Sequence, residues 1–288
     1  MKNLLLIFCL ITLLSCDDGD IIVTSLDFEN SNLEVCGGPG SYVFFKINST
    51  DAAESISVEF TTTDVLFTES AEQNFSIDGS TNSANYRTFS EAPTATYFCS
   101  SIPPTSPQTL QDFNAVSGNA TLFTTTVFDD NDGLINEDDE DTDGDGLANS
   151  LDEDDDGDNV LTSVEIGSDP DNPRDSDGDG IPDYLDTDDD NDGILTRYED
   201  ADGNLDPADD ETDPGMGADY LNPAVTAENI IDQFRPHSYD FTSDIRLVLT
   251  DLVLVNGEEQ ITRETLNFGE AVNIASATVT VTPDFPVN

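Results

Sequence analysis

Four segments in the middle of the chain carry aspartates at alternate positions, a spacing that could bind a metal ion. Each has Asp at positions 1, 3 and 5, Gly or Asn at position 6 and an acid at position 12, and they span 141–152, 154–165, 175–186 and 188–199. A tight turn with this spacing directs the carboxylates and the carbonyl of position 7 toward one centre. Such a set of oxygens predicts Ca²⁺ rather than Mg²⁺, which prefers few carboxylates and retains water.

The predicted ligands are the acids at positions 1, 3, 5 and 12 and the carbonyl at position 7 of each loop. They are Asp141, Asp143, Asp145, Leu147 and Asp152; Asp154, Asp156, Asp158, Val160 and Glu165; Asp175, Asp177, Asp179, Ile181 and Asp186; and Asp188, Asp190, Asp192, Ile194 and Glu199. An earlier loop keeps Asp130, Asp132 and Asp139 but starts at Phe128, so we count it as half a site. We therefore expect about four or more Ca²⁺ ions.

The loops also keep apolar residues in register, which a random acidic tract would not do. Loop starts at 141 and 154, and again at 175 and 188, share one interval, and the insertion 166–173 separates the two pairs. Degenerate copies follow, and 219–222 resembles 183–186 as if a last repeat closed the array. The alternative is a disordered acidic linker, which we expect to be the state without metal because its own charges repel.

The interval between loops distinguishes among calcium-binding families. EF-hands and dockerins need a helix after each loop, and the spacing leaves no room for one. Glycine-rich nonapeptide repeats need a Gly-Gly-x-Gly-x-Asp motif, which is absent. The segment 128–222 resembles the thrombospondin type 3 repeat, which implies Asp-rich loops wrapped around a string of Ca²⁺ ions with little regular secondary structure. It lacks the Cys residues interspersed in the animal repeats. We assign 129–222 to this array.

The N-terminus predicts export and lipid anchoring. Residues 1–15 have one Lys followed by an apolar run too short to span a membrane, as in a signal peptide. Leu13-Leu14-Ser15-Cys16 resembles a bacterial lipobox, which implies lipidation of Cys16 and a location in the cell envelope as an outer-membrane lipoprotein. The acidic tether 16–20 resembles a surface-export tag. An ordinary signal peptide with an incidental Cys is the alternative.

Cysteine use agrees with an exported protein. After removal of the signal peptide and lipidation of Cys16, Cys36 and Cys99 are left for an oxidising compartment. We predict that they form a disulfide, with two free buried thiols as the alternative.

The flanks of the acidic segment predict an all-β, sandwich-like fold. In 21–128, short runs rich in Val, Ile, Thr and Phe alternate with turn residues, and predict strands at 21–28, 41–47, 55–63, 64–69, 95–101 and 120–128 with loops at 36–40 and 100–109. In 223–288, Asn256-Gly257 predicts a hairpin between strands 244–255 and 260–268, and 276–282 predicts a last strand. A short helix is predicted over 226–234. This tail completes the first domain or forms a small module of its own.

Composition excludes some functions. Eight Lys and Arg residues against 62 Asp and Glu give a net charge of −54, which would repel nucleic acid. His237 is the only His, so zinc sites with two or three His are impossible, and we expect it at the surface. Because no nucleophile or phosphate-loop motif is found, we expect that the protein is not an enzyme.

The sequence supports three functional hypotheses. The first is a lipid-anchored cell-surface protein in which the calcium array stiffens a spacer and the β domains serve adhesion or matrix contact with an extracellular protein or glycan. The second is a glycan- or peptide-binding module with the array as a passive linker, for which Tyr86, Phe89 and Tyr97 could form an aromatic platform. The third is a calcium buffer or sensor.

Overall fold

The structure is a computed structural model that describes residues 26–49, 53–102, 104–134 and 140–285. The predicted signal peptide 1–15, the tether 16–20 with Cys16, most of the predicted strand 21–28, and Asp139 lie outside the described residues. The described part of the chain is mostly β, with 39% strand and 10% helix, as the flanks predicted.

The chain divides into two compact units. The first contains the described residues of Met1–Val65, Glu72–Phe123 and Arg246–Ala271. The second contains those of Leu66–Ala71, Thr124–Ile245 and Val272–Asn288. The acidic loops all lie in the second unit.

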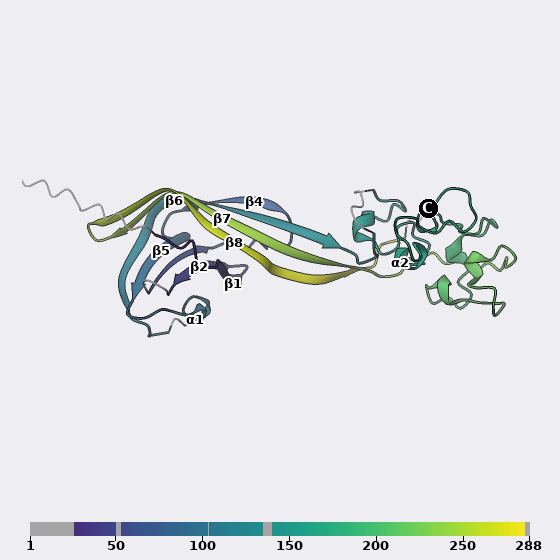
Figure 1. Cartoon of the computed structure of the whole chain (residues 1–288), viewed down its shortest axis with the longest axis horizontal. Helices are drawn as coiled ribbons and strands as arrows, with labels where there is room; N and C mark the ends of the chain where they lie inside the picture. The colour runs from purple at the N-terminus through teal and green to yellow at the C-terminus, as the bar shows by residue number, and fades with distance from the viewer. Residues whose placement is uncertain (1–25, 50–52, 103, 135–139, 286–288) are drawn as a thin grey trace, which may run out of the picture. The chain divides into compact units, whose positions relative to one another are not determined.

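Eight strands form one antiparallel sheet (Figure 1). They are β1 (Glu34–Gly38), β2 (Ser41–Asn48), β3 (Glu54–Phe60), β4 (Ala71–Ile77), β5 (Asn82–Phe89), β6 (Thr109–Asp129), β7 (His237–Asn256) and β8 (Glu259–Val281). Their hydrogen-bonded order is β1-β2-β3-β5-β6-β7-β8, and β4 also pairs with β6. The C-terminal strands β7 and β8 therefore continue the sheet from β6.

The core of the first unit comes from alternation along its strands. In β3, Ile56, Val58 and Phe60 are buried while Glu59 is exposed, as expected when one face of a strand packs inward. Phe44 of β2 pairs with Val58 in the register and is fully buried. These aromatic and β-branched side chains give the unit its apolar interior.

The predicted disulfide is confirmed, but the predicted strand at 95–101 is wrong. Cys36 and Cys99 are bonded, with their Cα atoms 5.7 Å apart. Residues Ala95–Cys99 form a short helix, α1, in place of a strand. The ring of Phe98 stacks on Phe45 of β2 at 4.4 Å between centroids. The disulfide and this stacking fix the helical turn although its residue types favour strands.

The predicted and observed strands also differ in segments that are rich in polar residues or turn residues. Strands β4 and β5, with sequences AEQNFSI and NSANYRTF, are too polar to have been predicted. Strand β1 runs through part of the predicted loop 36–40. Residues 64–69 form no strand, because side chains satisfy their carbonyls: Thr124 donates to the carbonyl of Leu66, and Ser243 donates to that of Phe67.

The predicted C-terminal hairpin is confirmed. Strand β7 ends at Asn256, and Gly257 follows with a φ of +63°, which glycine adopts without steric cost. The predicted strands 260–268 and 276–282 are parts of the single long strand β8. The helix predicted over 226–234 is wrong: this segment has no regular secondary structure, and it bonds to the acidic loops, for example from Asn229 N–H to the Tyr198 carbonyl at 2.7 Å.

The acidic segment has little regular structure beyond single helical turns. They are the short helix α2 (Thr162–Glu165) and the 3₁₀ turns η1 (Asn149–Leu151), η2 (Asp183–Leu185), η3 (Thr196–Tyr198), η4 (Pro207–Asp209) and η5 (Asp219–Leu221). Irregular loops connect them (Figure 1). The helical turns recur near the end of each acidic loop.

Candidate metal centre

The same backbone hydrogen bond closes every acidic loop. The N–H of position 9 donates to the carbonyl of the residue before position 1, at 2.7–3.0 Å; the pairs are Asn149 to Glu140, Thr162 to Glu153, Asp183 to Arg174, and Thr196 to Thr187. A helical turn begins at each of these donors. The four loops therefore share one backbone framework.

A side-chain bond between positions 2 and 9 reinforces each closure. The Thr162 hydroxyl accepts the N–H of Asp155 at 3.1 Å, and the Asp183 carboxylate accepts the N–H of Ser176 at 2.6 Å. The predicted closing repeat has the same bonds, since Asp219 N–H donates to the Asp210 carbonyl and Asp219 accepts from Thr212. Short polar side chains at position 9 hold each loop shut.

Positions 4 and 6 adopt the left-handed conformation that the tight bend needs. Gly residues fill most of them, and in the second loop Gly157 has a φ of +70° and Asn159 of +74°. Asn tolerates this region better than most residues, as predicted for position 159. The turn chemistry of the sequence thus sets the backbone on which the carboxylates stand.

In the first, second and fourth loops, each carboxylate at positions 3 and 5 uses one oxygen for a backbone hydrogen bond and keeps the other buried; in the third loop, Oδ2 of Asp177 accepts a hydrogen bond from Asn191 instead. One oxygen accepts the N–H two residues later; in the second loop, Asp158 N–H donates to Asp156 and Val160 N–H donates to Asp158. The other oxygen is buried and has no hydrogen-bond partner among the described residues. These oxygens are Oδ2 of Asp143, Asp145, Asp156, Asp158, Asp190 and Asp192. Buried oxygens without partners are costly unless a cation or water satisfies them.

The loops bring their acids close together as the spacing predicted. One oxygen from each acid lies within 4.8 Å of the others in three groups, which are Asp141, Asp143 and Asp145; Asp154, Asp156 and Asp158; and Asp175, Asp177 and Asp179. In the fourth loop, Asp188, Asp190 and Asp192 each have one buried oxygen without a hydrogen-bond partner among the described residues. These groups could hold metal ions.

One acid was missed by the sequence analysis. Asp189, at position 2 of the fourth loop, lies with Asp158 and Glu165 of the second loop in a further group of possible ligands, all three buried. Position 2 is Asp only in the second and fourth loops and a hydroxyl residue in the others. This difference at position 2 is the feature of the sequence that could have identified Asp189 as a ligand. The two loops, distant in sequence, thus share one acidic cluster.

The half-loop before the array keeps the same local geometry. Asp130 accepts the N–H of Asp132 at 3.1 Å, and Asp132 accepts the N–H of Leu134 at 2.8 Å. Phe128, at the first ligand position, packs its ring 5.9 Å from that of Tyr239. This loop therefore has a ring contact where the others have a carboxylate.

Burial perturbs the carboxylates strongly. Loss of solvent, followed by repulsion from neighbouring acids, raises the pKa of Asp154, Asp156, Asp158 and Glu165 well above their ordinary values. Burial also raises the pKa of Glu199 to about 9. A divalent cation would reverse this balance by favouring the charged forms. The donor set, made only of oxygens in loops two to four, fits a hard divalent cation.

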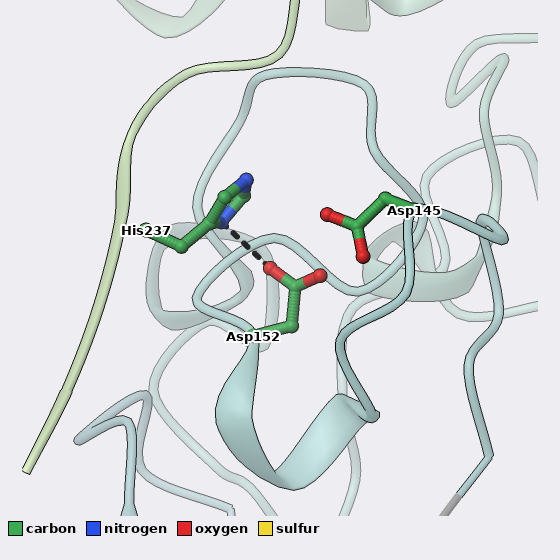
Figure 2. A group of neighbouring side chains, drawn as sticks. All are labelled: Asp145, Asp152 and His237. Carbon is green, nitrogen blue, oxygen red and sulfur yellow. Dashed lines mark ion pairs between the residues drawn. The ribbon is translucent and has the colours of Figure 1, made fainter. Parts of the chain in front are cut away.

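The prediction that His237 lies at the surface is wrong. Its side chain is 1% exposed, and Nδ1 lies 2.6 Å from Oδ1 of Asp152 (Figure 2). Burial lowers the pKa of His237, but the hydrogen bond and charge of Asp152, with the charges of Asp154 and Asp145, raise it overall. No periodic pattern in the sequence pointed to this residue, because His237 lies outside the array and only folding brings it to the first loop.

The predicted aromatic platform is also absent from the described surface. Tyr86 and Phe89 are 5% and 4% exposed and belong to the core of the first unit. Tyr97 packs its ring edge on Phe89 with centroids 5.1 Å apart.

Comparison with known proteins gives no relative: no protein-family model, curated protein or solved structure matches this chain. Within the described residues, no helix is both long and apolar enough to cross a membrane.

Proposed function

We propose that the protein binds Ca²⁺ through the acidic loops of 129–222, which form an array like the thrombospondin type 3 repeat. The observation that carries this proposal is the division of the carboxylates at positions 3 and 5 in the first, second and fourth loops, with one oxygen bonded to the backbone and the other buried without a hydrogen-bond partner in the described chain. Ca²⁺ takes six to eight oxygen ligands at flexible geometry, so carboxylates and loop carbonyls suit it.

The array acts as a calcium-dependent spacer in a lipid-anchored protein of the bacterial outer membrane. Without cations, its acids would repel one another and favour an expanded chain. Bound ions would remove this repulsion and shift the array toward its folded state. The disulfide supports an exported protein, because such bonds persist in oxidising compartments. The role is adhesive or structural rather than enzymatic.

A ligand-binding role for the first unit is the second candidate, and one cavity favours it. A cavity of about 640 Å³ is lined by Phe28, Lys46, Arg263 and Leu266 among others. Lys46 and Arg263 line this cavity together with Asp27 and Glu29, so it offers charges of both signs to a polar ligand. The test is to measure the binding of glycans and peptides to the protein and to its Lys46→Gln variant. Weaker binding by the variant would support a ligand in this cavity, and equal binding would count against it.

The proposal is tested by calcium titration of the metal-stripped chain, with calorimetry for the number of ions and small-angle scattering for dimensions. We expect four or more ions and a fall in maximum dimension as Ca²⁺ rises to millimolar levels, the affinity range of many extracellular modules. Asp190→Asn should remove one ion, since Asp190 is buried in the fourth loop. Asp171→Asn, an exposed acid in the insertion 166–173, makes the same charge change and should remove none. If the titration gives no heat and the scattering profile does not change, the segment is an acidic linker that binds no metal.

A further inference from the structure

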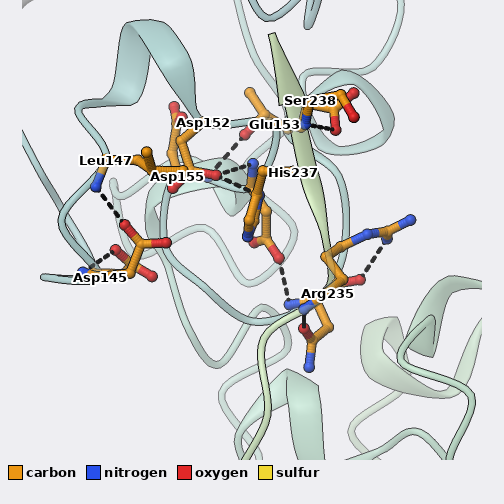
Figure 3. A network of polar contacts seen from close by, with 12 residues as sticks. Asp145, Leu147, Asp152, Glu153, Asp155, Arg235, His237 and Ser238 are labelled. Atoms are coloured by element: carbon orange, nitrogen blue, oxygen red, sulfur yellow. Dashed lines mark hydrogen bonds and ion pairs between the residues drawn. The ribbon is translucent and has the colours of Figure 1, made fainter. Parts of the chain in front are cut away.

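The first acidic loop differs from the other three by an imidazole at its centre. His237 begins β7, and backbone bonds on both sides fix its position against the loops (Figure 3). Ser238 N–H donates to the Glu153 carboxylate at 2.7 Å, and Arg235 N–H donates to the Asn159 side chain at 2.9 Å. The nitrogen donor is therefore held at the loop by contacts that do not involve its own ring.

Three donor atoms converge at this point. One atom each from Asp145, Asp152 and His237 lies within 4.8 Å of the others, and Figure 2 shows both carboxylates turned toward the imidazole. Oδ1 of Asp145 accepts the N–H of Leu147 at 2.7 Å, which leaves Oδ2 buried and without a hydrogen-bond partner among the described residues. Both ring nitrogens of His237 are buried on a ring that is 1% exposed, and Nδ1, which faces Asp152, is the one that would bind the ion.

The nitrogen changes which ion the site prefers. Ca²⁺ is bound by oxygen ligands, whereas imidazole suits Zn²⁺ and other borderline divalent ions, which also accept carboxylates. In a tetrahedral zinc site, bonds of about 2.0–2.2 Å place neighbouring donors about 3.3 Å apart. The gap of 2.6 Å between His237 Nδ1 and Asp152 Oδ1 needs to widen by less than an ångström to admit an ion.

We propose that His237, Asp145 and Asp152 form a site for a borderline divalent metal ion such as Zn²⁺, which takes the place of Ca²⁺ in the first loop when both metals are present, while the other three loops bind Ca²⁺. This inference rests on the proposed function, because Asp145 and Asp152 belong to the first loop. It makes the array a two-metal structure in which the start of β7 is fixed to the first loop by a metal–nitrogen bond.

The test is zinc binding by the full chain, stripped of metal, with free thiols alkylated and Ca²⁺ present at millimolar concentration. Calorimetry should show one equivalent of Zn²⁺, and Co²⁺ as a coloured substitute should give the visible absorption of a low-coordinate site. His237→Gln should weaken Zn²⁺ binding by 100-fold or more and leave the calcium content of the other loops unchanged. Asp171→Asn should change neither metal.

Since a buried His variant could fail to fold, the unmodified protein provides a second readout. His237 is the only His, so ¹⁵N spectra of the imidazole contain signals from this ring alone. Zn²⁺ should shift one ring nitrogen strongly, and Ca²⁺ should not. Unchanged ring signals with Zn²⁺, or complete displacement of Zn²⁺ by Ca²⁺, would overturn the inference while calcium binding stands. Zinc binding without any calcium binding would instead refute the proposed function alone.

Discussion

Replacement of Asp156 by Asn should change stability in opposite directions with and without metal. One oxygen each from Asp154, Asp156 and Asp158 lies within 4.8 Å of the others. At an effective dielectric constant of about 20, two like charges 4.8 Å apart repel by about 3 kcal/mol. Because burial and these neighbours raise the pKa of Asp156, protonation already relieves part of the repulsion. We therefore expect Asp156→Asn to stabilise the metal-free protein by less than the energy of one pair, at most about 3 kcal/mol.

With Ca²⁺ bound, the same replacement should destabilise. It removes a charged ligand, which should weaken that site by at least the 10–100-fold that loss of an outer-shell partner costs. The free energy of unfolding is measured in urea by tyrosine fluorescence, since the chain has no Trp, in metal-stripped and calcium-saturated protein. Calorimetry gives the calcium affinity. Asp171→Asn is the control of equal charge change and should leave both quantities unchanged.

One result would refute this reasoning. If Asp156→Asn destabilised the metal-free protein as much as the calcium-bound one, Asp156 would act through its hydrogen bond from Asp158 N–H, 3.2 Å long, and not through a metal.

Three further predictions concern pH, loop closure and the disulfide. Burial raises the pKa of Asp189 to about 8 and of Glu199 to about 9, so the folded metal-free protein holds more protons than the unfolded chain. Its urea midpoint should therefore fall as the pH rises from 5 to 9. Saturating Ca²⁺ should abolish this fall. Thr162→Val should lower the free energy of unfolding in urea by about 1–3 kcal/mol because it leaves the buried Asp155 N–H unsatisfied. The control Ser163→Ala changes an exposed residue and should lower it little. Equal effects of the two replacements would count against the hydrogen bond that closes the loop. Reducing the disulfide, which closes a sequence separation of 63, should lower stability by about 4 kcal/mol in the chain-entropy model, and an unchanged urea midpoint would contradict this.

Local chemistry made much of the structure predictable. The left-handed positions of the loops, filled by Gly and by Asn159, and the Asn256-Gly257 hairpin follow from backbone sterics that a few neighbouring residues decide. The disulfide between Cys36 and Cys99 followed from counting the cysteines of a chain whose N-terminus predicts export. These features depend on residue type and spacing, which a sequence displays directly.

Other features arose only from packing between distant segments. The helix α1 forms against strand propensity because Phe98 stacks on Phe45 and Cys99 is bonded to β1. The polar strands β4 and β5 take part in the sheet through their neighbours, which local pattern does not reveal.

The sequence by itself determined where the carboxylates stand within each loop, since their alternation and the glycines act over a few residues. Only the tertiary structure decided which groups share a centre: Asp189 lies beside the second loop, and His237 beside the first. The physical reason is that a loop closes by short-range hydrogen bonds, whereas a contact between residues far apart in the chain depends on how whole segments pack. The chemistry that distinguishes the first site from the others therefore came from folding.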